Sequence, residues 1–264
     1  MSYYQTLRRF HTQEGFFNHY TPIPLHRNCG NSDKCWVHPE PHNGIYSGIT
    51  RAHVGRFYDK TRLLVLGINN RMNYGRGNYQ IESTWIKDSA SIMKKSTAGV
   101  CAVHKYLAIY ATLFMSINEI LPKSQRIIDI DYKNQYHRKI LADNLQDFLA
   151  WTQVIKCNPK RGRSKPYDQM WTNCSQRILC GEIKALKPKY IISFGISGNY
   201  PTVLELLKKE YSGQKPRIYP VGNSHIEYWK GKKGKSEIHL IGLPHPVASI
   251  EKQNIMGILS KIKV

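Results

Sequence analysis

The sequence predicts an α/β protein, a three-layer α/β/α sandwich with a central four-stranded parallel sheet. Short apolar runs alternate along the chain with longer segments that are apolar at helical spacing. The runs are apolar throughout, as in strands that are buried on both faces. The chain has 264 residues, of which 41% are hydrophobic, enough for one such domain with a sizeable core.

Four strands and four helices follow from these patterns. The expected strands are 62–67 (RLLVLG), 148–156 (FLAWTQVIK), 190–195 (YIISFG) and 237–244 (EIHLIGLP). The expected helices are 100–121, 170–188, 201–211 and a closing helix at 255–264. The polar stretch 122–142 is expected to connect elements, and the Gly-containing run 228–237 to form a hairpin tip.

The domain organisation is expected to be one compact unit. Residues 61–264 carry the alternating strands and helices. Residues 1–60 form an N-terminal extension that holds a pair of cysteines.

The charge balance predicts a polyanionic partner. Lys and Arg number 39 against 18 for Asp and Glu, a net charge of +21. Nucleic acid, here DNA, is the simplest such partner, and a basic protein with a solvated surface is the alternative. No apolar run approaches the length of a membrane span, and residues 1–17 lack the apolar core of a signal peptide. We therefore expect a monomer in the cytoplasm, associated with the nucleoid.

The residues that follow the predicted strands are candidates for a binding site. In a parallel sheet covered on both faces, ligands bind at the carboxyl ends of the strands. The loops there are 67–80, 157–166, 195–201 and 245–249, and most combine Gly or Pro with hydrogen-bonding groups. Each loop alone has the composition of an ordinary turn. Their joint position predicts a pocket beside a basic rim.

Three motifs, and their order along the chain, resemble the uracil-DNA glycosylase superfamily over roughly residues 60–250. GIN at 67–69 is similar to the first motif of the mismatch-specific branch, and HPVAS at 245–249 to the second motif of the superfamily. VIKCNP at 154–159, followed by Cys174 and LKPKYIISFG at 186–195, resembles the iron–sulfur branch, usually called family 4.

The resemblance implies hydrolysis of the bond between uracil and deoxyribose in DNA. Asn69 would position the attacking water, and His245 would donate a hydrogen bond to uracil O2, where negative charge develops. Gln153 falls where the branch has an Asn, and its amide could read O4 and N3 of the extruded base. The other expected substrate contacts are Gly67, Ile68 and Ser249, with Tyr79, or else Tyr74, stacking on the base.

Two basic runs are expected to contact DNA phosphates. The first contributes Lys160, Arg161, Arg163 and Lys165, with no acidic residue between them. The second run, 228–237, contributes Lys232 and Lys233, with a solvated turn as the alternative. Phosphate contacts of this kind give an affinity that falls steeply with salt.

Six cysteines raise the question of a metal site. Cys101 and Cys180 fall within apolar helical patterns and are expected to pack as small hydrophobic side chains. The other four are Cys29, Cys35, Cys157 and Cys174. Their context in the resemblance implies a [4Fe–4S] cluster held by four thiolates. Zinc, with His26 or His38 as substitute ligands, and free thiols are the alternatives.

Departures from the branch keep other functions open. The first motif reads GINNR where the branch has GEAPG, and no Asp or Glu lies in 67–80. The substrate is therefore expected to be uracil first, then deaminated relatives such as hypoxanthine. The alternative is a catalytically inactive nucleic-acid-binding protein on the same fold. A nucleoside hydrolase is disfavoured, because its small substrate needs no basic rim.

Overall fold

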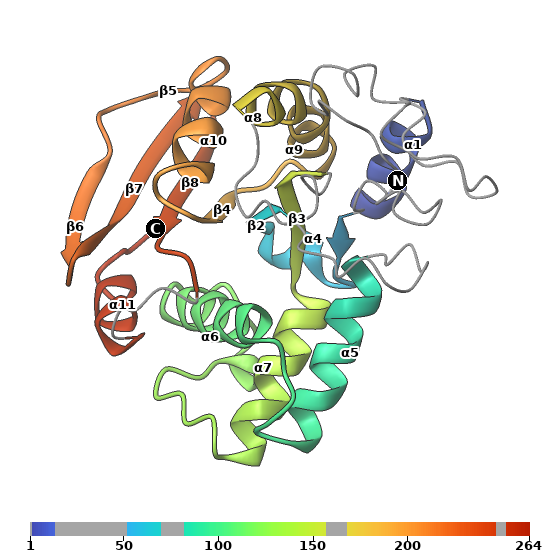
Figure 1. Ribbon diagram of the computed structural model, residues 1–264, viewed down its shortest axis with the longest axis vertical. Coiled ribbons are helices and arrows are strands. Elements are labelled where there is room, and N and C mark those ends of the chain that lie inside the picture. Colours follow the sequence, from blue (N-terminus) through green and yellow to red (C-terminus); the bar gives the residue numbers. More distant parts are fainter. Residues whose placement is uncertain (1, 14–51, 70–81, 157–167, 247–251) are drawn as a thin grey trace.

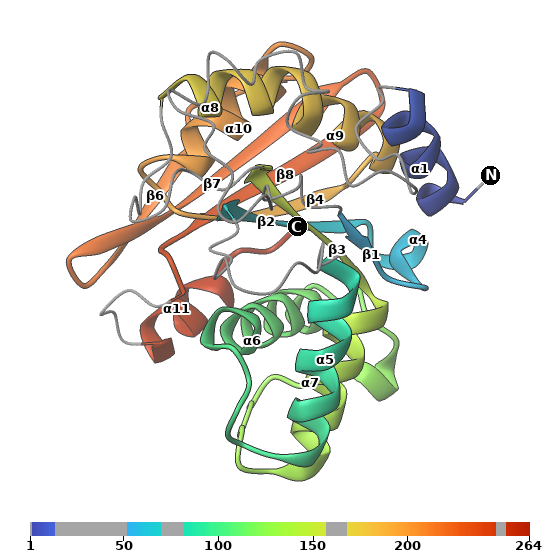
Figure 2. The same cartoon turned by 45° about the vertical axis from the view of Figure 1, so that its right-hand side comes forward.

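The computed structural model describes residues 2–13, 52–69, 82–156, 168–246 and 252–264, and these form a sheet between two layers of helices (Figures 1 and 2). The α/β class, the mostly parallel centre of the sheet and the helices on both faces are therefore confirmed. The expected number of strands is wrong, because the described residues form eight strands rather than four.

The four predicted strands make up the parallel centre of the sheet. They are β2 (Leu63–Asn69), β3 (Leu149–Ile155), β4 (Tyr190–Phe194) and β8 (Ser236–Leu243). They lie in the order β3-β2-β4-β8, and each neighbouring pair is parallel.

Antiparallel strands extend the sheet at both edges. β1 (His53–Val54) pairs with β3, and β7 (Ser224–Lys233) pairs with β8. β6 (Arg217–Val221) and β5 (Ser212–Gly213) both pair with β7. Two-residue strands leave no periodic pattern in the sequence, and β7 alternates buried and exposed residues instead of forming an apolar run. The hairpin expected within 228–237 is confirmed, with its turn at Gly234, where φ is 58°.

One face of the sheet is covered by α1 (Tyr3–Gln13), α8 (Asp168–Cys174), α9 (Cys180–Leu186) and α10 (Asn199–Lys208). A five-residue π-helix, Ser175–Leu179, joins α8 to α9, so the helix expected at 170–188 runs on but contains one wide turn. Alternate strand residues such as Leu64, Leu66 and Val154 face this layer.

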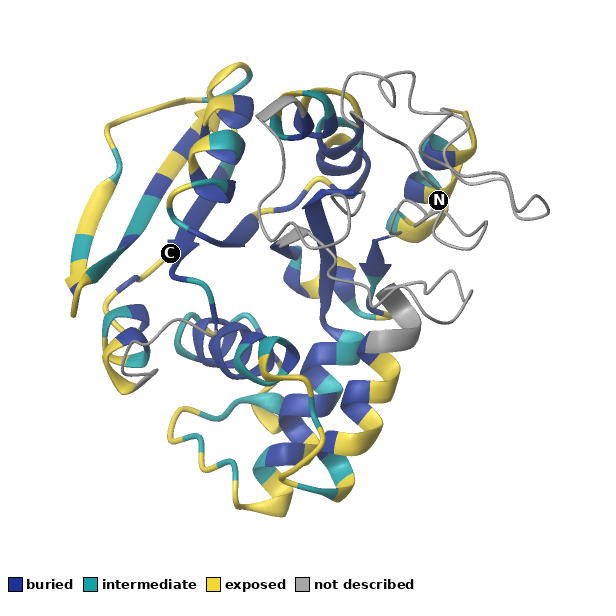
Figure 3. Ribbon diagram, in the orientation of Figure 1, coloured by how far each residue is buried: buried dark blue, intermediate teal, exposed yellow. Residues whose placement is uncertain are grey.

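The other face is covered by α5 (Glu82–Lys95), α6 (Ala102–Ile117), α7 (Gln135–Asp147) and α11 (Lys252–Leu259). The intervening strand residues, among them Leu63, Val65 and Trp151, pack against it. Figure 3 shows these strands buried between the two layers. The short helices α4 (Tyr58–Thr61) and Lys123–Gln125 lie in connections.

The expectation that 122–142 only connects elements is wrong, because helix α7 begins at Gln135. The Asn134 side chain accepts hydrogen bonds from the backbone N–H groups of Tyr136 and His137 and so caps the helix. Ile140, Leu141 and Leu145 then form its buried stripe. The polar residues that precede the cap obscured the start of this helix.

The described parts of the N-terminal 60 residues belong to the same body. Helix α1 packs against α9, and β1 is the edge strand next to β3. Cys101 is exposed at the N-cap of α6, so its expected role as a packed hydrophobic side chain is wrong. Among the described helices, none has both the length and the apolar content needed to cross a membrane.

Candidate functional site

The carboxyl ends of the four parallel strands lie at one edge of the sheet, which we call the carboxyl edge. The chain passes from β2 to β3 on one side and later returns to β4 on the other, so the strand order reverses between β2 and β4. β2 stays paired with β3 as far as Asn69 and Ile155, but its pairing with β4 ends at Leu66 and Ser193. Such a reversal is where ligands bind in sheets of this kind.

Asn69 and His245 follow the same row of paired strand residues. Leu66 lies beside Ser193, and Ser193 lies beside Gly242. Asn69 and His245 each follow this row by three residues, on the two sides of β4. At the usual strand spacing, Leu66 and Gly242 in this row are two strands, or about 10 Å, apart. His245 is half-buried between the buried Pro244 and Pro246.

Several predicted substrate contacts lie outside the described residues. These are Tyr79, Ser249 and the alternative Tyr74. Ile68 and Asn69 are described only as backbone, as the last two residues of β2.

Gly67 and Gln153, both predicted to contact the substrate, lie side by side on β2 and β3. A Cβ atom added at Gly67 would overlap Oε1 of Gln153 and would lie 3.0 Å from Cζ2 of Trp151. The Gln153 amide therefore occupies the space that any larger residue at position 67 would need. Gln153 is buried, and its amide is held at the carboxyl edge by this packing.

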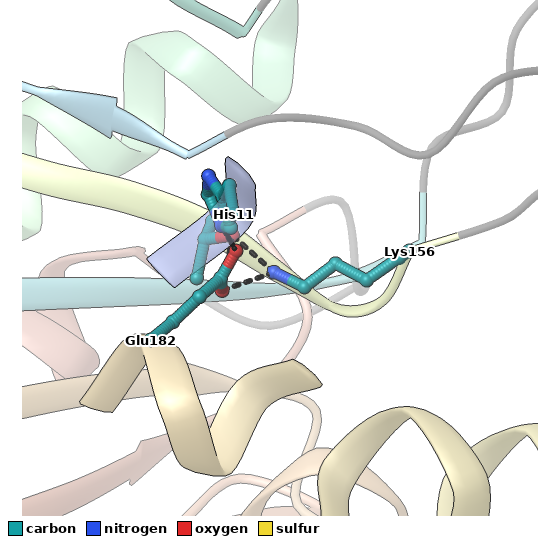
Figure 4. Close-up of polar contacts among 4 residues, drawn as sticks. His11, Lys156 and Glu182 are labelled. Atoms are coloured by element: carbon teal, nitrogen blue, oxygen red, sulfur yellow. Dashed lines mark hydrogen bonds and ion pairs between the residues drawn. The ribbon is translucent and has the colours of Figure 1, made fainter. Parts of the chain in front are cut away.

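A buried polar network lies at the end of β3, on the face covered by α9 (Figure 4). The ammonium group of Lys156 donates to Oε2 of Glu182 and to Oγ1 of Thr152. Thr152 Oγ1 donates to Glu182 Oε2 at 3.1 Å, and His11 Nε2 lies 2.9 Å from Glu182 Oε1. Lys156, Thr152 and Glu182 have no solvent exposure, and His11 has 5%. The network thus joins α1, β3 and α9.

The charges of this network depend on one another. Burial alone would raise the pKa of the Glu182 carboxyl group. The ammonium group of Lys156 and the contact with His11 outweigh that effect and hold the pKa below its ordinary value. Glu182 is therefore ionised at neutral pH although water does not reach it.

The predicted metal ligands are only partly described. Cys174 is buried at the end of α8, directly before the π-helix. Cys29, Cys35 and Cys157 lie outside the described residues. Within the part of the chain that the structure describes, no three His, Cys, Asp or Glu side chains gather as a metal site would require.

The two basic runs differ in what the structure describes. Lys160, Arg161, Arg163 and Lys165 lie outside the described residues. Lys232 and Lys233 lie beside Glu237 and Ser236 at the start of β8, which is the amino edge of the parallel strands. From Glu237 to Leu243, β8 spans about 20 Å, so the structure does not bring these two lysines near His245.

The lysines at the amino edge share carboxylates in pairs. Lys230 and Lys232 both contact Glu237, at 2.9 and 3.1 Å. Hydrogen bonds from these two lysines lower the pKa of Glu237 to about 2. Lys233 and Lys184 likewise share Glu210, at 3.0 and 3.1 Å. Each group of two lysines and one carboxylate keeps a single net positive charge.

Sequence reasoning missed two features of this region. Glu182 follows Ile178 and Leu179 at helical spacing, so an acid on an apolar stripe was the available signal for the buried network. Trp171 of α8 is half-buried and packs on Gly198, where an added Cβ atom would lie 2.9 Å from its ring. It places an aromatic ring beside the loop that follows β4.

Comparisons with known proteins provide no family. No model of a protein family matches this chain, and a search of curated proteins finds no significant match. The motifs, their order and the geometry of the carboxyl edge are the features of this chain that bear on its function.

Substitution of Lys156 tests the buried network. We expect Lys156→Met to lower the free energy of unfolding by about 3–5 kcal/mol, because it leaves the Glu182 carboxylate buried without its main counter-charge. Lys156→Met combined with Glu182→Gln should recover much of this loss. Because the pKa of Glu182 is lower in the folded state, its contribution should be lost as pH falls below about 4.3. Urea unfolding between pH 7 and pH 3 measures both effects.

The exposed Lys184–Glu210 pair provides the matched control. Lys184 is 61% exposed, so Lys184→Met should change the unfolding free energy by less than about 1 kcal/mol. Equal effects of the two Lys→Met substitutions would contradict a special role of the buried pair.

Substitution of Gly67 tests the position of the Gln153 amide. Gly67→Ala should cost about 1–3 kcal/mol of stability, because the added methyl group must displace Gln153 or Trp151. The control is Gly257→Ala in α11, where an added Cβ atom meets nothing within 4 Å. That variant should be neutral or slightly more stable, since Ala favours helix. Thermal unfolding of both variants provides the comparison, and equal stability would contradict the close packing at Gly67.

Proposed function

We propose that this protein is a DNA glycosylase that removes uracil, or a related deaminated base, and leaves an abasic site for base excision repair. The observation that carries the proposal is the position of Asn69 and His245 relative to β4. Asn69 comes three residues after Leu66 of β2, and His245 comes three residues after Gly242 of β8. Leu66 and Gly242 lie on the two sides of the same β4 residue, Ser193. The sequence motifs of Asn69 and His245 belong together in the superfamily that the chain resembles, and this topology supports a shared site for them.

The proposed reaction breaks the bond between N1 of uracil and C1′ of the sugar. The bonding electron pair leaves with the base, which becomes an anion with charge on O2. His245, fixed by its flanking prolines, donates a hydrogen bond to that oxygen. Asn69 orients a water molecule whose oxygen bonds to C1′, and the water proton passes to solvent. Because an oxocarbenium-like sugar is strongly electrophilic, an amide that orients water can serve without a strong base.

Recognition of the base requires its removal from the helix stack. We propose that the buried Gln153 amide, which packs beside Gly67, reads its pairing edge. We propose that Lys160, Arg161, Arg163 and Lys165 contact the phosphates near the site, since their loop follows β3 at the carboxyl edge. A DNA strand that also reached Lys232 and Lys233 would have to follow the length of the sheet to the amino edge.

The [4Fe–4S] cluster also remains a proposal. When bound, it would be held by the thiolates of Cys29, Cys35, Cys157 and Cys174 and would cross-link the segments that carry them. The buried network of His11, Lys156 and Glu182 supports this proposal, because it brings together three parts of the chain that adjoin the cysteines. His11 is in the helix before the first cysteine pair, Lys156 directly precedes Cys157, and Glu182 follows Cys174 in the same helical run.

A second candidate is a nucleic-acid-binding protein on the same fold without hydrolytic activity. The observation that favours it is the absence of Asp and Glu from 67–80, which leaves the first motif without an acidic group to activate water.

Excision activity distinguishes the two candidates. Incubation with a single-stranded oligonucleotide containing one uracil, followed by alkali, should break the strand at the lesion. Asn69→Ala and His245→Ala should each lower the rate by about a hundredfold or more. His137→Ala in α7 serves as control and should leave the rate unchanged. A gel shift by the wild-type protein without strand breakage would favour the binding protein instead.

The cysteine proposal is tested by spectrum and affinity together. The purified protein should be brown with a broad visible absorption band, and Cys157→Ser should lose that band and bind DNA more weakly, since the same segment carries the basic loop. Cys101→Ser, which changes an exposed cysteine, is the matched control and should change neither property. Unchanged DNA affinity in Cys157→Ser would count against a role of the metal in DNA binding.

A further inference from the structure

Basic and aromatic side chains gather on one face of the sheet beyond β8. In β7, Tyr228, Lys230 and Lys232 point to the same face, because alternate residues of a strand do so. The pairing register places Arg217 of β6 beside Tyr228, and Tyr219 points the same way two residues further along β6. We call this surface the basic tyrosine face; it consists of Arg217, Tyr219, Tyr228, Lys230 and Lys232.

This face lies on the side of the sheet that also carries α6 and α11. Ile226 of β7 and Ile241 of β8, which point the same way as Tyr228, are buried in that layer. Further out, burial gives way to exposure: the three basic residues of the face are exposed and its two tyrosines are half-buried. Figure 3 shows the same change, from the buried central strands to the exposed strand β6. The rings and the cations of the face therefore reach the surface together.

Tyr228 is held at the outer end of a row of rings. Its hydroxyl oxygen lies 2.9 Å from Nδ1 of His239, and the two rings stack with centroids 6.1 Å apart. The ring of His239 packs in turn on Tyr190, at 5.4 Å. Burial and the charge of Lys230 lower the pKa of His239 to about 4, so Nδ1 of the neutral imidazole can accept from the Tyr228 hydroxyl. A ring fixed in this way loses little freedom when a ligand packs on it.

The face carries a net positive charge. Lys230 and Lys232 share one acid, Glu237, and so keep one positive charge between them. Arg217 adds a second charge, since the residues nearest to it on this face are the two tyrosines. Glu227, the other acid of β7, points to the opposite side of the sheet. A polyanion therefore complements this face.

Aromatic rings among cations favour one kind of polyanion. In a single-stranded nucleic acid the phosphates can pair with Lys and Arg while the unpaired bases stack on aromatic rings. A duplex presents the same phosphates but keeps its bases stacked inside, and an acidic peptide offers charge without a stacking ring. Only the single strand uses both kinds of side chain on this face.

We propose that the basic tyrosine face binds single-stranded nucleic acid, with bases stacked on its two tyrosines and phosphates bound by its three cations. This inference does not depend on the proposed glycosylase activity. The face begins at Tyr219, which pairs with Ile226, and ends at Lys232, so it spans six residues of β7 or about 20 Å. A strand bound along it would run from the carboxyl edge to the amino edge.

An oligonucleotide without uracil tests this surface separately from the proposed catalytic site. A fluorescein-labelled thymidine oligonucleotide is titrated with the protein and followed by anisotropy, first as a single strand and then annealed to its complement. Wild-type protein should bind the single strand more tightly. Tyr228→Leu should weaken that binding about tenfold, the loss expected for one stacked base. Tyr228→Phe keeps the ring and should bind like wild-type protein.

Salt dependence tests the cations of the face. Arg217→Gln combined with Lys230→Gln should reduce the slope of log affinity against log salt by about 1.4, which is about 0.7 for each lost phosphate contact. Lys233→Gln is the matched control. Lys233 adjoins Lys232 in β7, is similarly exposed and also shares a carboxylate, but it points to the other side of the sheet. Its replacement should leave the slope unchanged.

The outcomes separate this inference from the proposed function. Equal binding of single strand and duplex, equal losses in Tyr228→Phe and Tyr228→Leu, or an equal change of slope in Lys233→Gln overturns the inference. Arg217 and Lys230 are exposed, so their variant remains decisive if Tyr228→Leu does not fold. Absence of uracil excision with the expected binding pattern overturns the glycosylase alone. Excision by a protein whose single-strand binding ignores these substitutions overturns the binding face alone.

Discussion

The contact between Lys156 and Glu182 joins β3 to α9, and through His11 it also holds α1. Both groups are charged and fully buried, so each requires the other to remain in place. Lys156 directly follows the last residue of β3, Glu182 comes from α9, and His11 attaches α1 to the same carboxylate. The end of β3, and with it the position of Gln153 three residues earlier, depends on this pair.

The two edges of the sheet differ in how far their charged groups are exposed. At the amino edge, exposed lysines share carboxylates in pairs. At the carboxyl edge, Lys156 and its partner Glu182 are fully buried. A net charge of +21 therefore indicates a class of partner but not its location. The proposed location follows from strand direction and from the reversal of strand order between β2 and β4.

The parallel centre of the fold could be predicted because each of its strands is an apolar run bounded by Gly, Pro or polar residues. β7 and α7 could not, since β7 alternates and α7 follows a polar stretch in which only the Asn134 cap marks a start. Gly67 and Gln153 were identified from different motifs, and the register of β2 and β3 makes them neighbours. Likewise, spacing suggests that Glu182 is buried but does not identify Lys156, 26 residues away, as its partner.

The π-helix between α8 and α9 has a consequence for the segment on both sides of it. In a regular α-helix, eight residues advance the side chain by about 80° beyond two full turns, so Cys174 and Glu182 would point in different directions. Hydrogen bonds that reach five residues back put more residues into each turn and reduce this difference. Both side chains are in fact buried against the sheet. In a regular helix one residue shorter at this point, the two side chains would be seven residues apart, about 20° short of two full turns, and would face the same side. The wide turn therefore accommodates one additional residue while both side chains stay inward.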